Sequence, residues 1–308
     1  MLVIVALGGN ALLRRGEPLR PAAQQENVKA ACRALAPLAE RHRLVVTHGN
    51  GPQVGLLAMQ DTGDDRFPLD VLGAETEGMI GYLIERELGN LLRPGLELVS
   101  VLTMVEVDAA DPAFSHPSKP IGPVYAKAEA ERLARRFAWT VSRDGNGYRR
   151  VVPSPAPQRI VEIEPIRWLL EQGCVVICAG GGGIPTVRRA GDGALDGVAA
   201  VIDKDLASSL LARQLGADLL VMATDVDGVY LDWGTPAQRR IARADPASLR
   251  GQCFAEGSMG PKIEAACAFV EGAGGTAVIG SLEDISQLVE GQAGTIVTAA
   301  AEGIELGR

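Results

Sequence analysis

Four short apolar runs in this chain each end in a turn rich in glycine or acidic residues, and this pattern limits the possible folds. A continuous apolar run such as Leu2–Leu7 is typical of a strand buried on both faces. The four runs end at Gly8, Gly49, Gly180 and Thr224, with helical patterns between them. The alternation predicts an α/β fold: a three-layer αβα sandwich around an open, mainly parallel sheet. The four turns should then share the sheet edge where ligands of such folds bind.

The chain is long enough for a sizeable core, with 308 residues of which 47% are hydrophobic. We interpret residues 1–308 as a single domain. Near Asp108 the composition shifts, and seven prolines follow by Pro157. This region also contains an expected helix over Lys127–Phe137 and a hairpin over Trp139–Val152. We therefore predict a small protruding lid subdomain over residues 109–164, inserted in the main domain.

The charge, the apolar stretches and the cysteines argue against a nucleic-acid-binding protein, a membrane protein and a protein held by disulfides. The net charge of −8 gives no electrostatic footprint for nucleic acid. The apolar first residues lack a basic segment before them, and no apolar stretch reaches membrane-spanning length, so we expect no membrane partner. The five cysteines include no CxxC pair and fit structural roles in a reducing compartment. We expect a cytoplasmic protein.

The segment from Gly197 to Tyr230 indicates chemistry on a phosphate. Asp203, Lys204 and Asp205 open a helix that Gly216 ends, and a buried strand follows. A helix start favours anions, a lysine neutralises phosphate charge, and aspartates can hold a lysine or a metal in place. A capped surface helix with a solvated ion cluster is the alternative.

Lysine is rare here, so each lysine is informative. Only five of the 30 basic residues are lysines, and arginine serves elsewhere. Lys119 lies on a stiff proline-containing loop, for which a rigid surface turn is the alternative. Lys262 follows Pro261 in the first turn of an expected helix starting near Ile263, where a cation opposes the helix dipole. A bound polyanion would compensate for this unfavourable interaction between the lysine and the helix dipole.

The glycine-rich turns predict backbone cradles for an anion. Gly8-Gly9-Asn10 and Gly49-Asn50-Gly51 follow two successive strands, and Gly180–Gly183 follows a third. Glycines allow close approach of the backbone, and exposed amides bind anions. Each turn alone could be an ordinary one, or a linker in the case of the four glycines.

Together, cradles, lysines and aspartates favour phosphoryl transfer, which needs positioning and charge neutralisation more than covalent chemistry. The sequence has neither the P-loop pattern, nor the protein-kinase motifs, nor a GxGxxG after the first strand. His48 lies in the second cradle, and nothing in the sequence favours it as a general base.

Seven motifs, spread collinearly over nearly the whole chain, resemble those of the carbamate kinases within the amino acid kinase family. They are ALGGNALL at residues 6–13, THGNGPQVG at 47–55, SKPIGPVY at 118–125, VVPSPAP at 151–157, CAGGGGIP at 178–185, VIDKDLAS at 201–208 and GSMGPKIEAA at 257–266. The SKPIGP and VIDKD segments distinguish this group from the acetylglutamate, glutamate and UMP kinases.

The resemblance implies reversible phosphoryl transfer between ATP and carbamate, giving carbamoyl phosphate and ADP. It implies Mg²⁺ carried on the nucleotide without a protein metal site, a homodimer, and ATP formation in arginine and carbamoyl phosphate catabolism. Roughly residues 1–190 would form the carbamate side and roughly residues 191–308 the nucleotide side. Another amino acid kinase specificity and a catalytically silent nucleotide or anion sensor are the alternatives.

The resemblance also assigns roles to residues at matching positions. The catalytic candidates are Lys119, Lys204, Lys262, Asp205 and, more weakly, Asp203. The candidates for binding carbamate or carbamoyl phosphate are Gly8, Gly9, Asn10, Gly49, Asn50, Gly51, Gly181 and Gly182. The candidates for binding the nucleotide are Thr224, Asp225, Tyr230, Ser258, Met259, Pro261 and Lys262.

Overall fold

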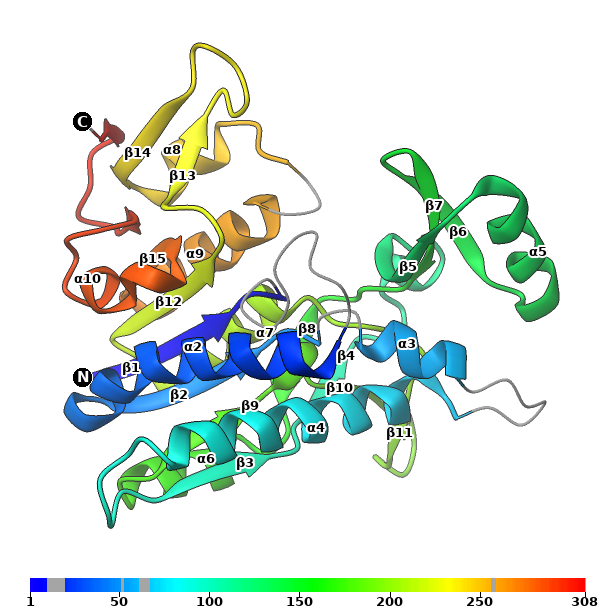
Figure 1. Ribbon diagram of the computed structural model, residues 1–308, viewed down its shortest axis with the longest axis horizontal. Coiled ribbons are helices and arrows are strands. Elements are labelled where there is room, and N and C mark those ends of the chain that lie inside the picture. The colour runs from blue at the N-terminus through cyan, green and yellow to red at the C-terminus, as the bar shows by residue number, and fades with distance from the viewer. Residues whose placement is uncertain (10–19, 51–52, 61–66, 256–258, 308) are drawn as a thin grey trace.

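The computed structural model describes residues 1–9, 20–50, 53–60, 67–255 and 259–307, which form three sheets (Figure 1). The strands of the largest sheet are β1 (Leu2–Leu7), β2 (Arg43–His48), β3 (Leu98–Val101), β9 (Val175–Cys178), β12 (Leu219–Thr224), β13 (Val229–Leu231), β14 (Arg239–Ala244), β15 (Thr276–Ser281), β16 (Thr295–Val297) and β17 (Ile304–Leu306). Their order is β13-β14-β16-β15-β12-β1-β2-β9-β3, with β17 paired to β14.

The centre of this sheet is parallel, as the apolar runs predict. Strands β15, β12, β1, β2, β9 and β3 are parallel neighbours in that order. The carboxyl ends of β12, β1, β2 and β9 are therefore adjacent. The turns after Thr224, Leu7, His48 and Cys178 all leave from one edge of the sheet.

Helices cover both faces of the sheet, which confirms the three-layer sandwich. Val3, Val5 and Leu7 of β1 pack in one core with helices α2 (Pro21–Arg41), α4 (Leu69–Gly89) and α10 (Ile285–Val289). The alternate β1 side chains lie in a second core with α6 (Ile163–Glu171), α7 (Lys204–Leu215) and α9 (Met259–Ala273). Burial of each large aliphatic side chain stabilises the fold by about 1.5–3 kcal/mol, so both cores fix the central strand.

Two smaller sheets flank this sandwich. One contains β4 (Met104–Val107), β8 (Pro157–Ile160), β10 (Ile184–Arg188) and β11 (Leu195–Gly197). The other contains β5 (Lys119–Tyr125), β6 (Thr140–Asp144) and β7 (Gly147–Val152), and it carries α5 (Lys127–Phe137). Figure 1 shows this three-stranded unit standing apart from the main sheet, beside α3 (Gln53–Gln60). It falls within residues 109–164, whose role as a lid stays a prediction. The remaining short helices are η1 (Pro112–Phe114), η2 (Gly180–Gly182), α8 (Pro246–Arg250) and η3 (Leu282–Asp284).

The structure corrects two expected boundaries. The apolar run over residues 96–107 predicts one strand, but the chain forms β3 and β4 in two different sheets, separated at Leu102 and Thr103. An apolar pattern records burial and does not identify the partner strand. Helix α9 begins at Met259 rather than near Ile263, so Lys262 is its fourth residue. Proline is tolerated in the first helical turn, where its missing N–H loses no helical bond.

Glycines within a helix predict close packing against a neighbouring element, and in α4 this holds at Gly81 and not at Gly73. A Cβ placed on Gly81 would lie 3.2 Å from Ser100 Oγ, whereas one placed on Gly73 would have nothing within 4 Å. Among the described residues, no helix is both long enough and apolar enough to cross a membrane.

Candidate active site

The start of α7 follows β11 and lies at the carboxyl edge of the sheet. Asp203 caps it, since its Oδ1 accepts the backbone N–H groups of Asp205 at 2.9 Å and Leu206 at 3.4 Å. Ser208 Oγ lies 2.6 Å from both Thr47 Oγ1 and the Lys204 carbonyl oxygen, which ties this turn to β2. The helix start is therefore fixed over the tips of the strands.

Two aspartates bring three distant lysines together. Asp205 accepts from Lys204 Nζ at 2.5 Å on one carboxylate oxygen and from Lys262 Nζ at 2.9 Å on the other. Lys119 of β5 forms an ion pair with the Oδ2 of Asp203. We call these five residues the lysine cluster. Lysines from β5, α7 and α9 thus meet at one helix start, as the sequence motifs predict for a phosphate site.

Burial and neighbouring charges shift the pKa values of Asp205 and Lys204 in opposite directions. The Lys204 and Lys262 side chains are each 12% exposed, and Asp205 is 5% exposed. Burial would raise the pKa of Asp205, but the charges and hydrogen bonds of both lysines outweigh it and hold that pKa well below its usual value. Burial lowers the pKa of Lys204, an effect that Asp205 opposes. Asp205 is therefore an ionised carboxylate that holds two ammonium groups side by side.

The Lys204 stem packs against the second glycine turn, at Gly49. A Cβ placed on Gly49 would lie 3.4 Å from both Lys204 Cδ and the Gly9 nitrogen. A Cβ on Gly8 would lie 2.9 Å from the Ala223 carbonyl oxygen, so the first turn also packs against the end of β12. At these positions a side chain would occupy the space that the lysine and the backbone share.

The four-glycine turn after β9 faces the second glycine turn. A Cβ placed on Gly181 would lie 2.1 Å from Asn50 Oδ1, and one on Gly182 would lie 2.5 Å from the Ile202 carbonyl oxygen. The Nε2 of His48 and the Oδ1 of Asn50 are buried and have no hydrogen-bond partner among the described residues. Buried polar groups are normally paired, so the Oδ1 of Asn50, a half-buried residue, is available to a bound ligand. His48 is fully buried, and Gly180 packs against its Nε2.

The candidates for the nucleotide side form a second group, on segments that follow β12 and begin α9. Thr224 Oγ1 donates to Asp225 at 3.2 Å, and the Tyr230 hydroxyl donates to Asp227 at 2.8 Å. The last candidates of this group that the structure describes, Met259, Pro261 and Lys262, lie in the first turn of α9. Lys262 joins this group to the lysine cluster. The candidates Asn10, Gly51 and Ser258 lie outside the described residues.

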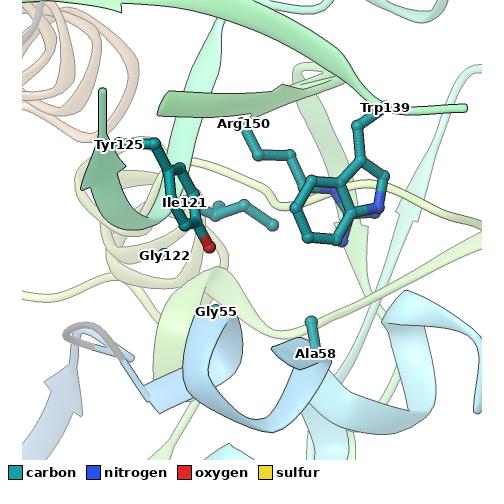
Figure 2. Close-up of a pocket in the computed structure, with 7 residues that line it drawn as sticks. All are labelled: Gly55, Ala58, Ile121, Gly122, Tyr125, Trp139 and Arg150. Atoms are coloured by element: carbon teal, nitrogen blue, oxygen red, sulfur yellow. The ribbon is translucent and has the colours of Figure 1, made fainter. Parts of the chain in front are cut away.

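The three-stranded unit touches the main domain at two glycines. A Cβ placed on Gly55 of α3 would lie 2.1 Å from Gly122 Cα, so the two backbones are in direct contact. Figure 2 shows this contact at a pocket whose other walls are Ala58 of α3 and side chains of the three-stranded unit, namely Ile121, Tyr125, Trp139 and Arg150. Gly122 is three residues beyond Lys119 on β5. The contact therefore sets how far Lys119 reaches toward Asp203.

Replacing Gly55 with alanine should reduce phosphoryl transfer. The added methyl group would meet the Gly122 backbone, which cannot move aside as a flexible side chain can, and β5 must shift. We expect kcat to fall at least about tenfold, the scale at which small misplacements of a positioning group act. Gly73→Ala is the matched control, since its methyl group meets nothing within 4 Å and a helical alanine should be neutral or stabilising. Steady-state kinetics and thermal melts of both variants check this, and equal kcat values would contradict it.

Two residues behind the glycine turn were missed by the sequence motifs. Glu77 of α4 accepts the backbone N–H of Gly180 at 2.8 Å, and Thr103 Oγ1 accepts that of Ala179 at 2.9 Å. One signal could have identified Glu77: it precedes the buried Ile80 and Ile84 by three and seven residues, so it lies on the buried face of the helix.

The acidic side chains of the lysine cluster bear on whether the protein itself could hold a metal ion. Its two aspartates are already engaged by lysines. Within the described ranges there is no group of three His, Cys, Asp or Glu side chains placed to hold an ion. A cation bound mainly by phosphate oxygens needs no such group.

Comparison with known proteins agrees with this geometry. The family model for the amino acid kinase family matches residues 1–281. The chain is 56% identical to a carbamate kinase of Haemophilus influenzae over 99% of both chains, and 54% identical to one of Rhizobium meliloti over 99% of this chain and 95% of that one. It also matches the structure of a carbamate kinase from Giardia lamblia bound to AMP-PNP, with a TM-score of 0.87, 36% identity and coverage of 96% of this chain and 98% of that one. The chain belongs to the amino acid kinase family.

Proposed function

We propose that the protein is a carbamate kinase, which transfers a phosphoryl group reversibly between ATP and carbamate. The observation that carries this proposal is the lysine cluster, in which Asp205 holds Lys204 and Lys262 beside the glycine turns. Full-length similarity to carbamate kinases supports the choice of acceptor.

The chemistry requires two negatively charged groups to approach each other. A carbamate oxygen attacks the γ-phosphorus of ATP, a new P–O bond forms, and the bond to the β-phosphate oxygen breaks to release ADP. Carbamate is already an oxyanion, so no general base is needed. We assign Lys204 to the transferred phosphoryl group, Lys262 to the β/γ-phosphate side and Lys119 to the carbamate end. Fixed cations at these points stabilise charge without reorganising during the reaction.

The remaining candidate residues fall into two groups, one for the carbamate and one for the nucleotide. The glycine turns at Gly8–Gly9, Gly49 and Gly181–Gly182, with Asn50, would hold carbamate or carbamoyl phosphate. The residues from Thr224 to Tyr230 and those at the start of α9 would frame the nucleotide. The division at about residue 190 and the lid formed by residues 109–164 belong to the same proposal.

Mg²⁺ bound to the nucleotide phosphates would supply further charge neutralisation. We expect ATP formation to be lost when a chelator removes divalent cations, and to return when Mg²⁺ is added in excess over the chelator. The expected loss is at least about 100-fold, the scale of a missing electrostatic stabiliser. Full activity in chelator would contradict the Mg²⁺ requirement and assign the charge neutralisation to side chains of the protein.

We propose that the cell uses the reaction to form ATP in arginine and carbamoyl phosphate catabolism, that the enzyme is cytoplasmic, and that it is a homodimer. Light scattering on the purified protein measures its mass and decides the last of these.

The direct test is ATP formation from ADP and carbamoyl phosphate, compared with acetylglutamyl phosphate. We expect turnover with the first phosphoryl donor only. Turnover with acetylglutamyl phosphate would indicate another specificity within the family. Binding of ADP without turnover would favour a nucleotide or anion sensor.

A further inference from the structure

Glu77 is a buried carboxyl group behind the four-glycine turn. Its residue is 3% exposed and lies on α4. One oxygen accepts the Gly180 backbone N–H at 2.8 Å, and the other lies 3.4 Å from the Thr103 backbone nitrogen, which donates to it. A Cβ placed on Gly180 would lie 2.4 Å from His48 Nε2 and 2.9 Å from Glu77 Cγ. The Gly180 backbone is thus enclosed between these two side chains.

The turn that Glu77 holds has positive φ angles, which suit its glycines and are unfavourable at Ala179. Gly181, Gly182 and Gly183 have φ values of 68°, 99° and 80°, and the non-glycine residue Ala179 has φ of 50°. A non-glycine residue keeps such a conformation only where neighbouring groups enforce it. Thr103 holds both ends, because its Oγ1 accepts the Ala179 N–H at 2.9 Å and its carbonyl oxygen accepts the Ile184 N–H at 2.8 Å. Between these two ends, Glu77 accepts the backbone N–H of Gly180.

The front of the same turn contacts residues of the candidate active site. Gly181 packs against Asn50, and Gly182 packs against the Ile202 carbonyl. Ile202 directly precedes Asp203, the cap of α7. A displacement of the turn would therefore move both the carbamate end and the start of the helix that carries Lys204.

We propose that Glu77 is a positioning residue for phosphoryl transfer, which holds the Gly180 N–H from behind and so fixes the glycine turn against Asn50 and the start of α7. This inference rests on the proposed function.

The ionisation of Glu77 fits this role. Burial raises its pKa to about 8, although its hydrogen bonds to Gly180 and Thr103 oppose the rise. Burial likewise lowers the pKa of His48 to about 4. Both side chains are therefore mainly neutral at pH 7. The other titratable groups facing Glu77 are Glu162, whose charge raises the pKa of Glu77, and the buried Cys178. A glutamine has nearly the same shape, and its amide oxygen can accept the Gly180 N–H, so it should replace Glu77 in this role although it gives up the longer 3.4 Å contact with the Thr103 nitrogen.

The test compares Glu77→Gln and Glu77→Met in ATP formation from carbamoyl phosphate and ADP. We expect Gln to keep kcat within about threefold of wild type. We expect Met, which cannot accept the Gly180 N–H, to lower kcat at least about tenfold and to raise KM for carbamoyl phosphate, with KM for ADP unchanged. Glu75→Met is the matched control, because Glu75 is exposed on the same helix.

A wild-type kcat in Glu77→Met would overturn the inference, as would an equal loss in Gln and Met or an equal rise in both KM values. A wild type that forms no ATP would end the proposed function, and this inference with it. If Glu77→Met fails to fold, the pH profile decides. The ratio of wild-type to Glu77→Gln kcat should fall as pH rises through about 8, where only wild type gains a buried charge. A ratio independent of pH would then overturn the inference.

Discussion

Replacing Lys204 with methionine should remove most phosphoryl transfer and leave the protein folded. Lys204 is the lysine whose stem crosses Gly49 and whose ammonium group Asp205 holds, so its charge lies beside the strand tips. Without it, the transferred phosphoryl group loses a fixed cation at the point where negative charge is crowded. Removal of such a group lowers kcat by about 10²–10³, and by about 10³–10⁵ where a cation acts directly on the phosphoryl group, so we expect a loss of at least about 10³.

The fold should tolerate this change. Methionine fills most of the space of the lysine stem, and Asp205 keeps Lys262 as its partner at 2.9 Å. Lys127→Met is the matched control. The Lys127 side chain is 70% exposed, and its ion pair with Glu131 is a surface pair 4.0 Å long, so its loss should change little. Turnover is measured by the coupled formation of ATP, and folding by circular dichroism and thermal melting. A kcat within tenfold of wild type in a folded Lys204→Met protein would remove the basis of the proposed mechanism.

The sequence predicts that the turns at the carboxyl ends of the strands lie together, because local sequence patterns determine this arrangement. Apolar runs followed by glycine turns identify parallel strands, and parallel strands have their carboxyl ends at one edge. The order β12-β1-β2-β9 then makes the turns at Thr224, Gly8, Gly49 and Gly180 neighbours. The three lysines could be selected because each stands in a motif and lysine is rare in this chain.

Several contacts between residues that are distant in the sequence could not be predicted from it. The division of residues 96–107 between two sheets depends on partner strands that are distant in sequence, and no local pattern encodes it. The pairing of Lys119 with Asp203 rather than Asp205 depends on how β5 approaches α7. Glu77 was missed because a glutamate within a helix is usually solvated, and only the tertiary fold places Gly180 beside it.

Replacing Asp205 with asparagine should cause the largest combined loss of stability and activity. Its carboxylate is 5% exposed and separates two ammonium groups that would otherwise repel each other. Removing one partner of a buried ion pair lowers the free energy of unfolding by about 3–5 kcal/mol. We also expect kcat to fall at least about 100-fold, because Lys204 and Lys262 lose the group that orients them.

The pH dependence of unfolding distinguishes this explanation from a simple packing defect. The pKa of Asp205 is lower in the folded than in the unfolded protein, so its contribution to stability is present above pH 4 and is lost as pH falls toward its folded pKa. The stability difference between wild type and Asp205→Asn should therefore shrink on acidification. It should also shrink as pH rises toward 10.5, the ordinary pKa of lysine, because burial lowers the pKa of Lys204, whose unpaired ammonium group in the variant can then lose its proton. Chemical denaturation across this range measures the difference, with the exposed Asp196→Asn as control. A difference that stays constant at every pH would mean that lost packing, and not charge, accounts for the destabilisation.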